Sequence, residues 1–313
     1  MSGPIDELDR KSANRGMAVI EVREGRTTNI GELGILRVLP TKNRRTVGPW
    51  CFVDLMQADD VDRPPPLEIG PHPHIGLATV TWLFTGTALH SDSLGTEQLI
   101  RPGQLNLMTA GHGIAHAEEG MDTDQVWEST GTMGVQMWLA QPEATRQGTS
   151  AFQHLAELPE TQVGPSHGHV LIGELGEARS PAEFAHPTIG LDLTLGADTV
   201  IPTERSFEHA VVPVEKPIRV ENEIVEPGSL AIVPTGRDHL RLSARSFPAR
   251  LMLLGGEPLG EEVKMWWNFV ARSTDEITQA WRDWQIGNED RFGLVPSGLA
   301  RMDAPMPPWV RQD

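Results

Sequence analysis

The stretch Pro71-His72-Pro73-His74-Ile75-Gly76 decides the expected fold, together with a second stretch, Gly111-His112-Gly113-Ile114-Ala115-His116-Ala117-Glu118. Each stretch supplies two metal-ligating side chains that are two residues apart, His72 with His74 and His116 with Glu118. Residues two apart point to the same face of a β-strand, and neighbouring strands lie about 4.8 Å apart. If both stretches are strands, four donors can meet on one ion. The pattern therefore predicts β-structure with a metal site between strands.

The predicted metal ligands are His72, His74, His116 and Glu118. Three neutral imidazoles and one carboxylate suit a divalent first-row metal such as iron, nickel, manganese or zinc. No thiolate is available to close the site, so an open coordination position is expected. A single pair of this kind usually lies on the surface or has its hydrogen bonds satisfied within the protein. Together, beside glycines and apolar runs, the two pairs favour one ion per chain.

These residues also carry a family resemblance. The segment from His72 to Glu118 resembles the metal-binding core of the pirin family, within the cupin superfamily. The resemblance rests on the His-Pro-His-x-Gly motif, the turn Asp92-Ser93-Leu94-Gly95, the pair Pro102-Gly103, and residues 109–118. Residues 136–142, 255–260 and 266–270 also look like pirin segments, so the resemblance covers most of the chain. It implies two cupin-type β-barrels, a bicupin of jelly-roll barrels.

Composition favours the same fold class. The 313 residues include 25 Pro and 31 Gly between short apolar runs, which is typical of an all-β sandwich or barrel. The formal net charge of −17 argues against direct nucleic-acid binding, which needs clustered Lys and Arg. The sequence shows neither a signal peptide nor an apolar run long enough to span a membrane, so a cytoplasmic location is expected. The single cysteine, Cys51, lies in an apolar run and is expected to be buried and inert.

An internal repeat supports two barrels. Residues 100–111 resemble residues 225–236, and in each copy a Pro-Gly turn precedes an alternating apolar strand. Carried forward, the alignment places Arg241 and Ser243 opposite His116 and Glu118. With a slightly larger offset upstream, Pro202 and Glu204 stand opposite His72 and His74. The second barrel is therefore expected to lack metal ligands.

The expected domains are residues 1–145, the metal-binding barrel, and residues 146–313, the second barrel. The boundary is expected between residues 142 and 164, where a Gln-, Glu- and Pro-rich segment interrupts the strands. As in the family, residues before about 45 are expected to cross over and complete the second barrel. A short C-terminal helix near 274–286 follows from the capping box of Ser273 and Glu276. Its apolar stripe, expected to pack on a barrel, comprises Ile277, Ala280, Trp281 and Trp284.

Other histidines are weaker candidates. His167 and His169 form a second His-x-His, but no His-x-Glu pair follows at a plausible spacing, and His209 and His239 are isolated. His112 stands where the family often has arginine, which suggests a place at the mouth of a pocket. Cupins often place a glutamate four residues after the second histidine, and here that residue is Ala78. A base role would therefore fall on Glu118 alone.

The resemblance implies a quercetin 2,3-dioxygenase-type enzyme, in which one divalent metal ion binds a flavonol-like or other enolisable phenolic substrate beside dioxygen. Fe(II) is the first expectation, and Ni, Mn, Co, Cu or Zn are alternatives. Glu118 would be the catalytic base as well as a ligand. The rival hypothesis is a non-enzymatic redox-sensing regulator that binds a partner protein through the metal-bearing barrel. A metal-dependent isomerase or a carbohydrate-binding cupin is less favoured, because the resemblance extends beyond the generic cupin core.

Overall fold

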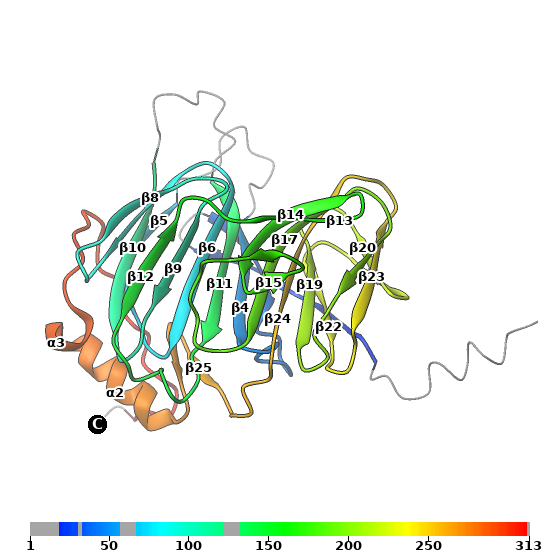
Figure 1. Cartoon of the computed structure of the whole chain (residues 1–313). Coiled ribbons are helices and arrows are strands. Elements are labelled where there is room, and N and C mark those ends of the chain that lie inside the picture. Colours follow the sequence, from blue (N-terminus) through cyan, green and yellow to red (C-terminus); the bar gives the residue numbers. More distant parts are fainter. Residues whose placement is uncertain (1–18, 31–32, 57–66, 122–131, 312–313) are drawn as a thin grey trace, which may run out of the picture.

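The structure is a computed structural model that describes residues 19–30, 33–56, 67–121 and 132–311. Two β-barrels lie side by side, and two short helices lie beneath the first barrel (Figure 1). The prediction of an all-β bicupin with a short C-terminal helix is confirmed. Neither of the described helices is long and apolar enough to cross a membrane. Residues 1–18 of the expected first domain lie outside the described residues.

The first barrel is built from two antiparallel sheets. The larger, seven-stranded sheet contains, in order, β12 (Ala151–Leu155), β9 (Leu105–Thr109), β6 (Leu77–Thr85), β11 (Met133–Ala140), β4 (Trp50–Met56), β3 (Leu33–Leu39) and β2 (Arg26–Ile30). The smaller, four-stranded sheet contains β5 (Glu68–His74), β10 (Ile114–Gly120), β7 (Ala88–Asp92) and β8 (Glu97–Ile100). The first predicted metal-binding stretch therefore contains the end of β5, and the second contains the start of β10.

The second barrel repeats this arrangement. Its seven-stranded sheet contains β1 (Glu21–Glu24), β22 (Ser229–Val233), β19 (Glu208–Pro213), β24 (Ala249–Gly256), β17 (Thr188–Leu195), β14 (Ser166–Ile172) and β13 (Glu160–Val163). Its four-stranded sheet contains β18 (Thr199–Pro202), β23 (His239–Ala244), β20 (Ile218–Val220) and β21 (Glu223–Val225). Two small hairpins are added, β15 (Glu174–Leu175) with β16 (Ala178–Arg179) and β25 (Lys264–Trp266) with β26 (Phe269–Ala271).

The repeat found in the sequence has the same local structure in both copies. The backbone N–H of Gln104 donates to Arg101 O at 3.1 Å, and that of Ser229 donates to Glu226 O at 3.0 Å. Each turn contains a glycine in the left-handed region, Gly103 with φ +85° and Gly228 with φ +87°. A side chain is strained there, which explains why both copies carry Pro-Gly.

Strand pairing does not follow a single cut of the chain. β1, from the N-terminal region, pairs with β22 of the second barrel, with Glu21 opposite Ile232. β12 pairs with β9 of the first barrel, with Ala151 opposite Thr109. Each strand completes one edge of a seven-stranded sheet. The domain limits at residues 145 and 146 stay a prediction.

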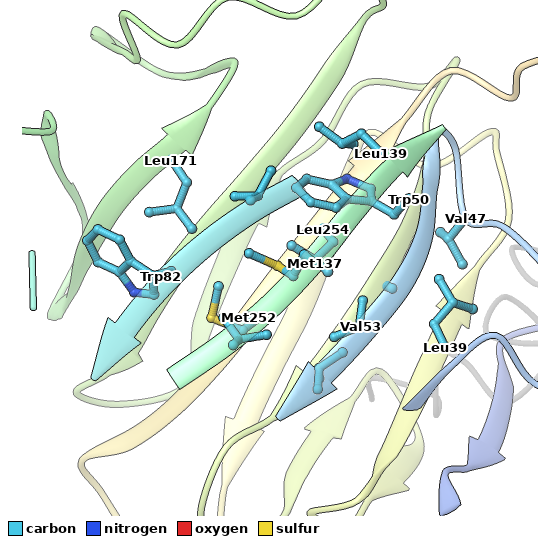
Figure 2. Packing of buried hydrophobic residues seen from close by; sticks show 14 of the residues in the cluster. Leu39, Val47, Trp50, Val53, Trp82, Met137, Leu139, Leu171, Met252 and Leu254 are labelled. Carbon is cyan, nitrogen blue, oxygen red and sulfur yellow. The ribbon is translucent and has the colours of Figure 1, made fainter. Parts of the chain in front are cut away.

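The largest core lies between the two barrels (Figure 2). Trp82 of β6 points out of the first barrel and packs with Leu171, Met252 and Leu254 of the second, and Val80 belongs to the same cluster. Polar bonds fix the interface, because Trp82 Nε1 donates to Asp192 Oδ2 at 2.8 Å. The indole N–H of Trp50 is shared between two carbonyl oxygens of the second barrel, at 3.1 and 3.0 Å. A β-carbon at Gly190 would lie 3.0 Å from the Trp50 ring, so this close approach favours glycine.

The interiors of the barrels differ in polarity. In the second barrel, the inward residues of β19, β17 and β24 form an apolar cluster with the smaller sheet, and its members include Val211, Leu191 and Leu253. In the first barrel, the middle inward residues of β6 are two buried threonines, Thr79 and Thr81. The first barrel therefore has room for polar chemistry in its centre.

The C-terminal helix forms as predicted. α2 (Thr274–Gln285) begins after Ser273, whose side chain accepts from the backbone N–H of Glu276. The carboxylate of Glu276 accepts from the backbone N–H of Arg272 at 3.2 Å and pairs with Arg146, so it does not close the box on Ser273. The expected apolar stripe on α2 packs on Ile75 and Phe269 beside the first barrel. The short helix α3 (Glu289–Phe292) follows, and its Phe292 belongs to the same cluster.

Cys51 is fully buried on β4. Burial raises the pKa of its thiol to about 12. A thiol with so high a pKa stays protonated at neutral pH and is a poor nucleophile, as predicted.

Candidate metal centre

Three histidines meet between β5 and β10. His72 and His74 lie two apart on β5, and His116 of β10 is the direct strand partner of His72. Their ligand atoms all lie within 4.8 Å of one another, and each residue is at most 6% exposed. Nε2 of His74 lies 3.0 Å from Nε2 of His116. The structure therefore brings together the three histidines that the sequence selected.

Backbone carbonyls orient two of these rings. His72 Nδ1 lies 2.9 Å from Gly70 O, and His74 Nδ1 lies 3.1 Å from Asn268 O. A carbonyl oxygen can only accept, so these partners assign the ring hydrogen to Nδ1 in both histidines. The lone pair of Nε2 is then free. Asn268 lies in the turn between β25 and β26, so a C-terminal hairpin holds a residue of the N-terminal barrel.

A fourth histidine, His90 on β7, lies behind His116. The Nδ1 atoms of His90 and His116 are 3.4 Å apart, and His90 Nε2 lies 3.1 Å from Asp92 Oδ2. Asp92 Oδ1 accepts from the backbone N–H groups of Leu94 and Thr96. Burial raises the pKa of Asp92, but its hydrogen bonds outweigh that effect and hold the pKa below its ordinary value.

Glu118 lies in a second, overlapping group with His90 and His116, all buried and with ligand atoms within 4.8 Å of one another. Its carboxylate accepts from Gln136 Nε2 at 3.4 Å, and Thr81 Oγ1, which donates to Gln136 Oε1 at 2.7 Å, lies 3.3 Å from it. The register between β10 and β5 shifts between His116 and Glu118, so Glu118 is paired with Ile69. The four predicted ligands therefore fall into two groups that share His116.

Burial sets the ionisation of the cluster. It lowers the pKa of His72 to about 4, and it lowers the pKa values of His74 and His116 well below the ordinary value. The same cause raises the pKa of Glu118, because a buried carboxylate loses its hydration. The imidazoles are therefore neutral at physiological pH, which is the form that binds metals.

The donor set fits a divalent cation. Two nitrogen ligands at about 2.1 Å from one ion and at right angles to each other are about 3.0 Å apart. His74 Nε2 and His116 Nε2 have this separation. If both atoms carry lone pairs they repel each other, and a shared cation removes the repulsion. The cluster can therefore hold a metal ion.

Aromatic side chains surround the histidines. Trp138 stacks on Phe52 with ring centroids 3.9 Å apart, and it meets His74 edge to face at 5.1 Å. Phe152 stacks on His90 at 4.5 Å. Trp138 is 6% exposed, and its buried Nε1 has no hydrogen-bond partner among the described residues.

The remaining candidates lie away from this cluster. His167 is exposed on β14, and His169 is half-buried beside Trp82. His112 is exposed, with its Nδ1 3.0 Å from Gln147 Oε1, and its place at a pocket mouth stays a prediction. Ala78 faces the core between the barrels, so a glutamate there would point away from the histidines. Among the described residues, groups of three or more metal-ligating side chains occur only around His116.

Fold and site together define a bicupin with a buried histidine cluster in its first barrel. The sequence profile of the Pirin family matches residues 32–139, and that of the Pirin C-terminal cupin domain matches residues 189–293. The chain therefore belongs to the pirin family, as the motifs predicted.

Two relatives illustrate the likeness. A Pseudomonas aeruginosa protein named "Putative quercetin 2,3-dioxygenase" is 40% identical over 282 residues, which cover 89% of this chain and 87% of the relative. A pirin-like protein of Caulobacter vibrioides is 35% identical over 276 residues, covering 85% and 93% of the two chains.

Crystal structures agree. Quercetin 2,3-dioxygenase from Acinetobacter baumannii matches with a TM-score of 0.83 at 35% identity, covering 94% of this chain and 97% of that chain. The Escherichia coli pirin YhhW, determined in complex with nickel(II), matches with a TM-score of 0.58 at 18% identity, covering 77% and 100%. The second likeness shows the shared fold.

Proposed function

We propose that the chain is a metal-dependent dioxygenase of the quercetin 2,3-dioxygenase type. In this proposal His72, His74, His116 and Glu118 hold one divalent ion, with Fe(II) as the first choice. The observation that carries the proposal is the convergence of the three neutral imidazoles, in which Nε2 of His74 and Nε2 of His116 are 3.0 Å apart. The names of the similar Pseudomonas and Acinetobacter proteins support the reaction class.

The proposed substrate is a flavonol or another enolisable phenolic compound, and dioxygen is the second substrate, which reacts with it. A bound Fe(II) would supply a Lewis acid and a source of electrons for the reaction with dioxygen. The aromatic surroundings of Phe52, Trp138 and Phe152 suit a planar aromatic ring. The free indole N–H of Trp138 can donate to a substrate oxygen and orient it.

Glu118 is proposed as the base that removes the hydroxyl proton of the substrate. Its raised pKa makes the carboxylate a better proton acceptor than an exposed one. Gln136 donates to the carboxylate, and Thr81 holds Gln136 by donating to its Oε1. In flavonol cleavage the proton would move from the substrate hydroxyl to a Glu118 oxygen before the central ring opens with loss of carbon monoxide.

An optical assay tests the proposal. Flavonols absorb in the near ultraviolet, and the band disappears when the central ring is cleaved. Protein loaded separately with Fe(II), Ni(II), Mn(II), Co(II) or Cu(II) is mixed anaerobically with flavonol, and oxygen is then added. We expect decay that requires both metal and oxygen. Absence of decay with every metal would reject the flavonol dioxygenase and favour the redox-sensing regulator.

Substitution of the base gives a sharper test. Glu118→Gln keeps an oxygen donor of similar size but cannot accept the proton, so turnover should fall about 10²- to 10⁴-fold while metal is partly retained. Glu119→Gln is the matched control, because Glu119 is the next residue on β10 and its carboxylate bonds to Ser297. Near wild-type turnover of the Glu118 variant, with normal metal content, would remove Glu118 from the catalytic role.

A further inference from the structure

His90 and Asp92 repeat the spacing of the predicted ligand pairs. They lie two apart on β7, and β7 pairs with β10 so that His116 is opposite Asp92 and Glu118 is opposite His90. All four residues are buried, with exposed fractions of at most 3%. Side chains directly opposite on antiparallel strands lie on the same face, so His90 and Asp92 face the cluster.

The hydrogen bonds of this pair assign its proton positions. Asp92 Oδ1 takes two backbone N–H groups, and Oδ2 takes the N–H of His90 Nε2 at 3.1 Å. In a neutral imidazole only one nitrogen carries hydrogen, so His90 Nδ1 is an acceptor. It faces His116 Nδ1 at 3.4 Å, and His116 therefore donates from Nδ1.

The consequence concerns the other nitrogen of His116. With its hydrogen on Nδ1, His116 presents a bare Nε2 to His72 and His74. Among the described residues, His90 Nδ1 is the one acceptor within hydrogen-bond distance of His116 Nδ1. His72 and His74 have backbone carbonyls for the same purpose, whereas His116 depends on a side chain.

We propose that His90, held by Asp92, is a positioning residue that fixes the tautomer and orientation of His116 and so tunes the affinity and potential of the metal site. The inference rests on the proposed metal role of the three histidines. A partner on the far nitrogen makes a ligating imidazole more basic, and loss of such a partner typically weakens metal binding about 10- to 100-fold. Flavonol turnover is not needed to test it.

A second proton arrangement makes the opposite prediction. If His116 carried its hydrogen on Nε2, it would donate to His74 Nε2, and its bare Nδ1 would face His90 Nδ1. An ion would then sit in the group of His90, His116 and Glu118. His90 would be a ligand in that arrangement, and His72 would not.

Two variants of His90 separate these arrangements. His90→Phe keeps an aromatic ring to stack on Phe152 but removes the acceptor. His90→Asn restores an acceptor, because its Oδ1 lies close to the position of the imidazole Nδ1. His209→Phe is the matched control, since His209 is buried in the second barrel and has an unpaired Nδ1 among the described residues. Thermal melts establish that each variant is folded.

The first readout is binding of nickel(II) alone, measured by equilibrium dialysis. We expect one ion per chain in all three variants, affinity about 10- to 100-fold weaker in His90→Phe, and recovery of most of that loss in His90→Asn. His72→Ala should abolish binding. Loss of the ion in His90→Phe together with its retention in His72→Ala would overturn the proposal, as would unchanged affinity in His90→Phe.

The second readout is the tautomer of His116 in the metal-free protein, observed by long-range ¹⁵N–¹H NMR. We expect hydrogen on Nδ1 in the wild type and in His90→Asn, and a mixture of tautomers in His90→Phe. Hydrogen on Nε2 in the wild type would refute the proposed relay. The midpoint potential of the iron-loaded protein should shift in His90→Phe and return toward the wild-type value in His90→Asn.

Discussion

The pH dependence of metal binding provides a quantitative test of the buried cluster. Protons compete with the metal for each imidazole, so an exposed histidine with a pKa of about 6.5 loses about tenfold in affinity per pH unit below that value. At pH 6.5 half of each such imidazole is already protonated, so three of them would together lose about 170-fold, or about 3 kcal/mol, between pH 6.5 and 5.5. In this protein burial lowers the pKa of His72 to about 4, and it lowers those of His74 and His116 as well.

The directions of these pKa shifts determine how the metal affinity changes with pH. A lowered pKa keeps the imidazoles neutral to lower pH, so their share of the affinity is lost only as pH falls toward about 4. Glu118 has a raised pKa and must be ionised to act as a ligand, so it is the group that protonates first. The logarithm of the dissociation constant should therefore change by no more than about one unit per pH unit between pH 6.5 and 5.5, the share of a single proton.

Equilibrium dialysis with nickel(II) at pH 7.5, 6.5 and 5.5 measures this slope, with circular dichroism as the check on folding. Glu118→Gln is the matched control, because it should remove the remaining pH dependence in this range. A slope of about two protons between pH 6.5 and 5.5 would refute the reasoning, since it would mean that the histidines titrate as exposed groups do.

Two further predictions concern stability. His209 also has a pKa lowered by burial to about 4. Below pH 6.5 the unfolded chain takes up a proton at this residue and the folded chain does not, so the free energy of unfolding falls as pH decreases toward 4. His209→Leu should make this decline shallower by about 1.4 kcal/mol per pH unit. Denaturant melts from pH 7 to 4.5 measure it, and an unchanged slope would contradict the assignment. Trp82→Phe removes the buried bond to Asp192 and part of the contact between the barrels, so the free energy of unfolding should fall by about 2–4 kcal/mol. The control is Trp309→Phe, where the ring is 41% exposed, and equal losses in both variants would show that the bond to Asp192 is unimportant.

The sequence predicted the fold because its signals are local and repeated. The Pro-Gly turns at Gly103 and Gly228, the cap at Ser273 and the alternating apolar residues of β9 each depend on a few neighbouring residues. The likeness to the pirin family then joined these signals into two barrels. Periodicity alone would have left the pairing of the strands open.

The site was predicted less completely, because part of it depends on contacts distant in the chain. The partner of His74 is a carbonyl oxygen 194 residues away, which carries no side-chain signal. The shift of register after His116 separates Glu118 from His72, and a spacing of two residues gives no sign of it. His90 does have a signal, since His90-Ser91-Asp92 shows the same alternation as the ligand pairs, but the family motif includes only Asp92 of this segment, as the first residue of a turn.

The exchange of edge strands restricts how the gene can be shortened or recombined. A fragment that stops at residue 145 would leave β9 without β12, and one that starts there would leave β22 without β1. Unpaired strand edges of this kind recruit other chains and lead to aggregation. Chimaeras between relatives should therefore be joined after residue 155, and residues 21–24 should come from the parent that donates the second barrel.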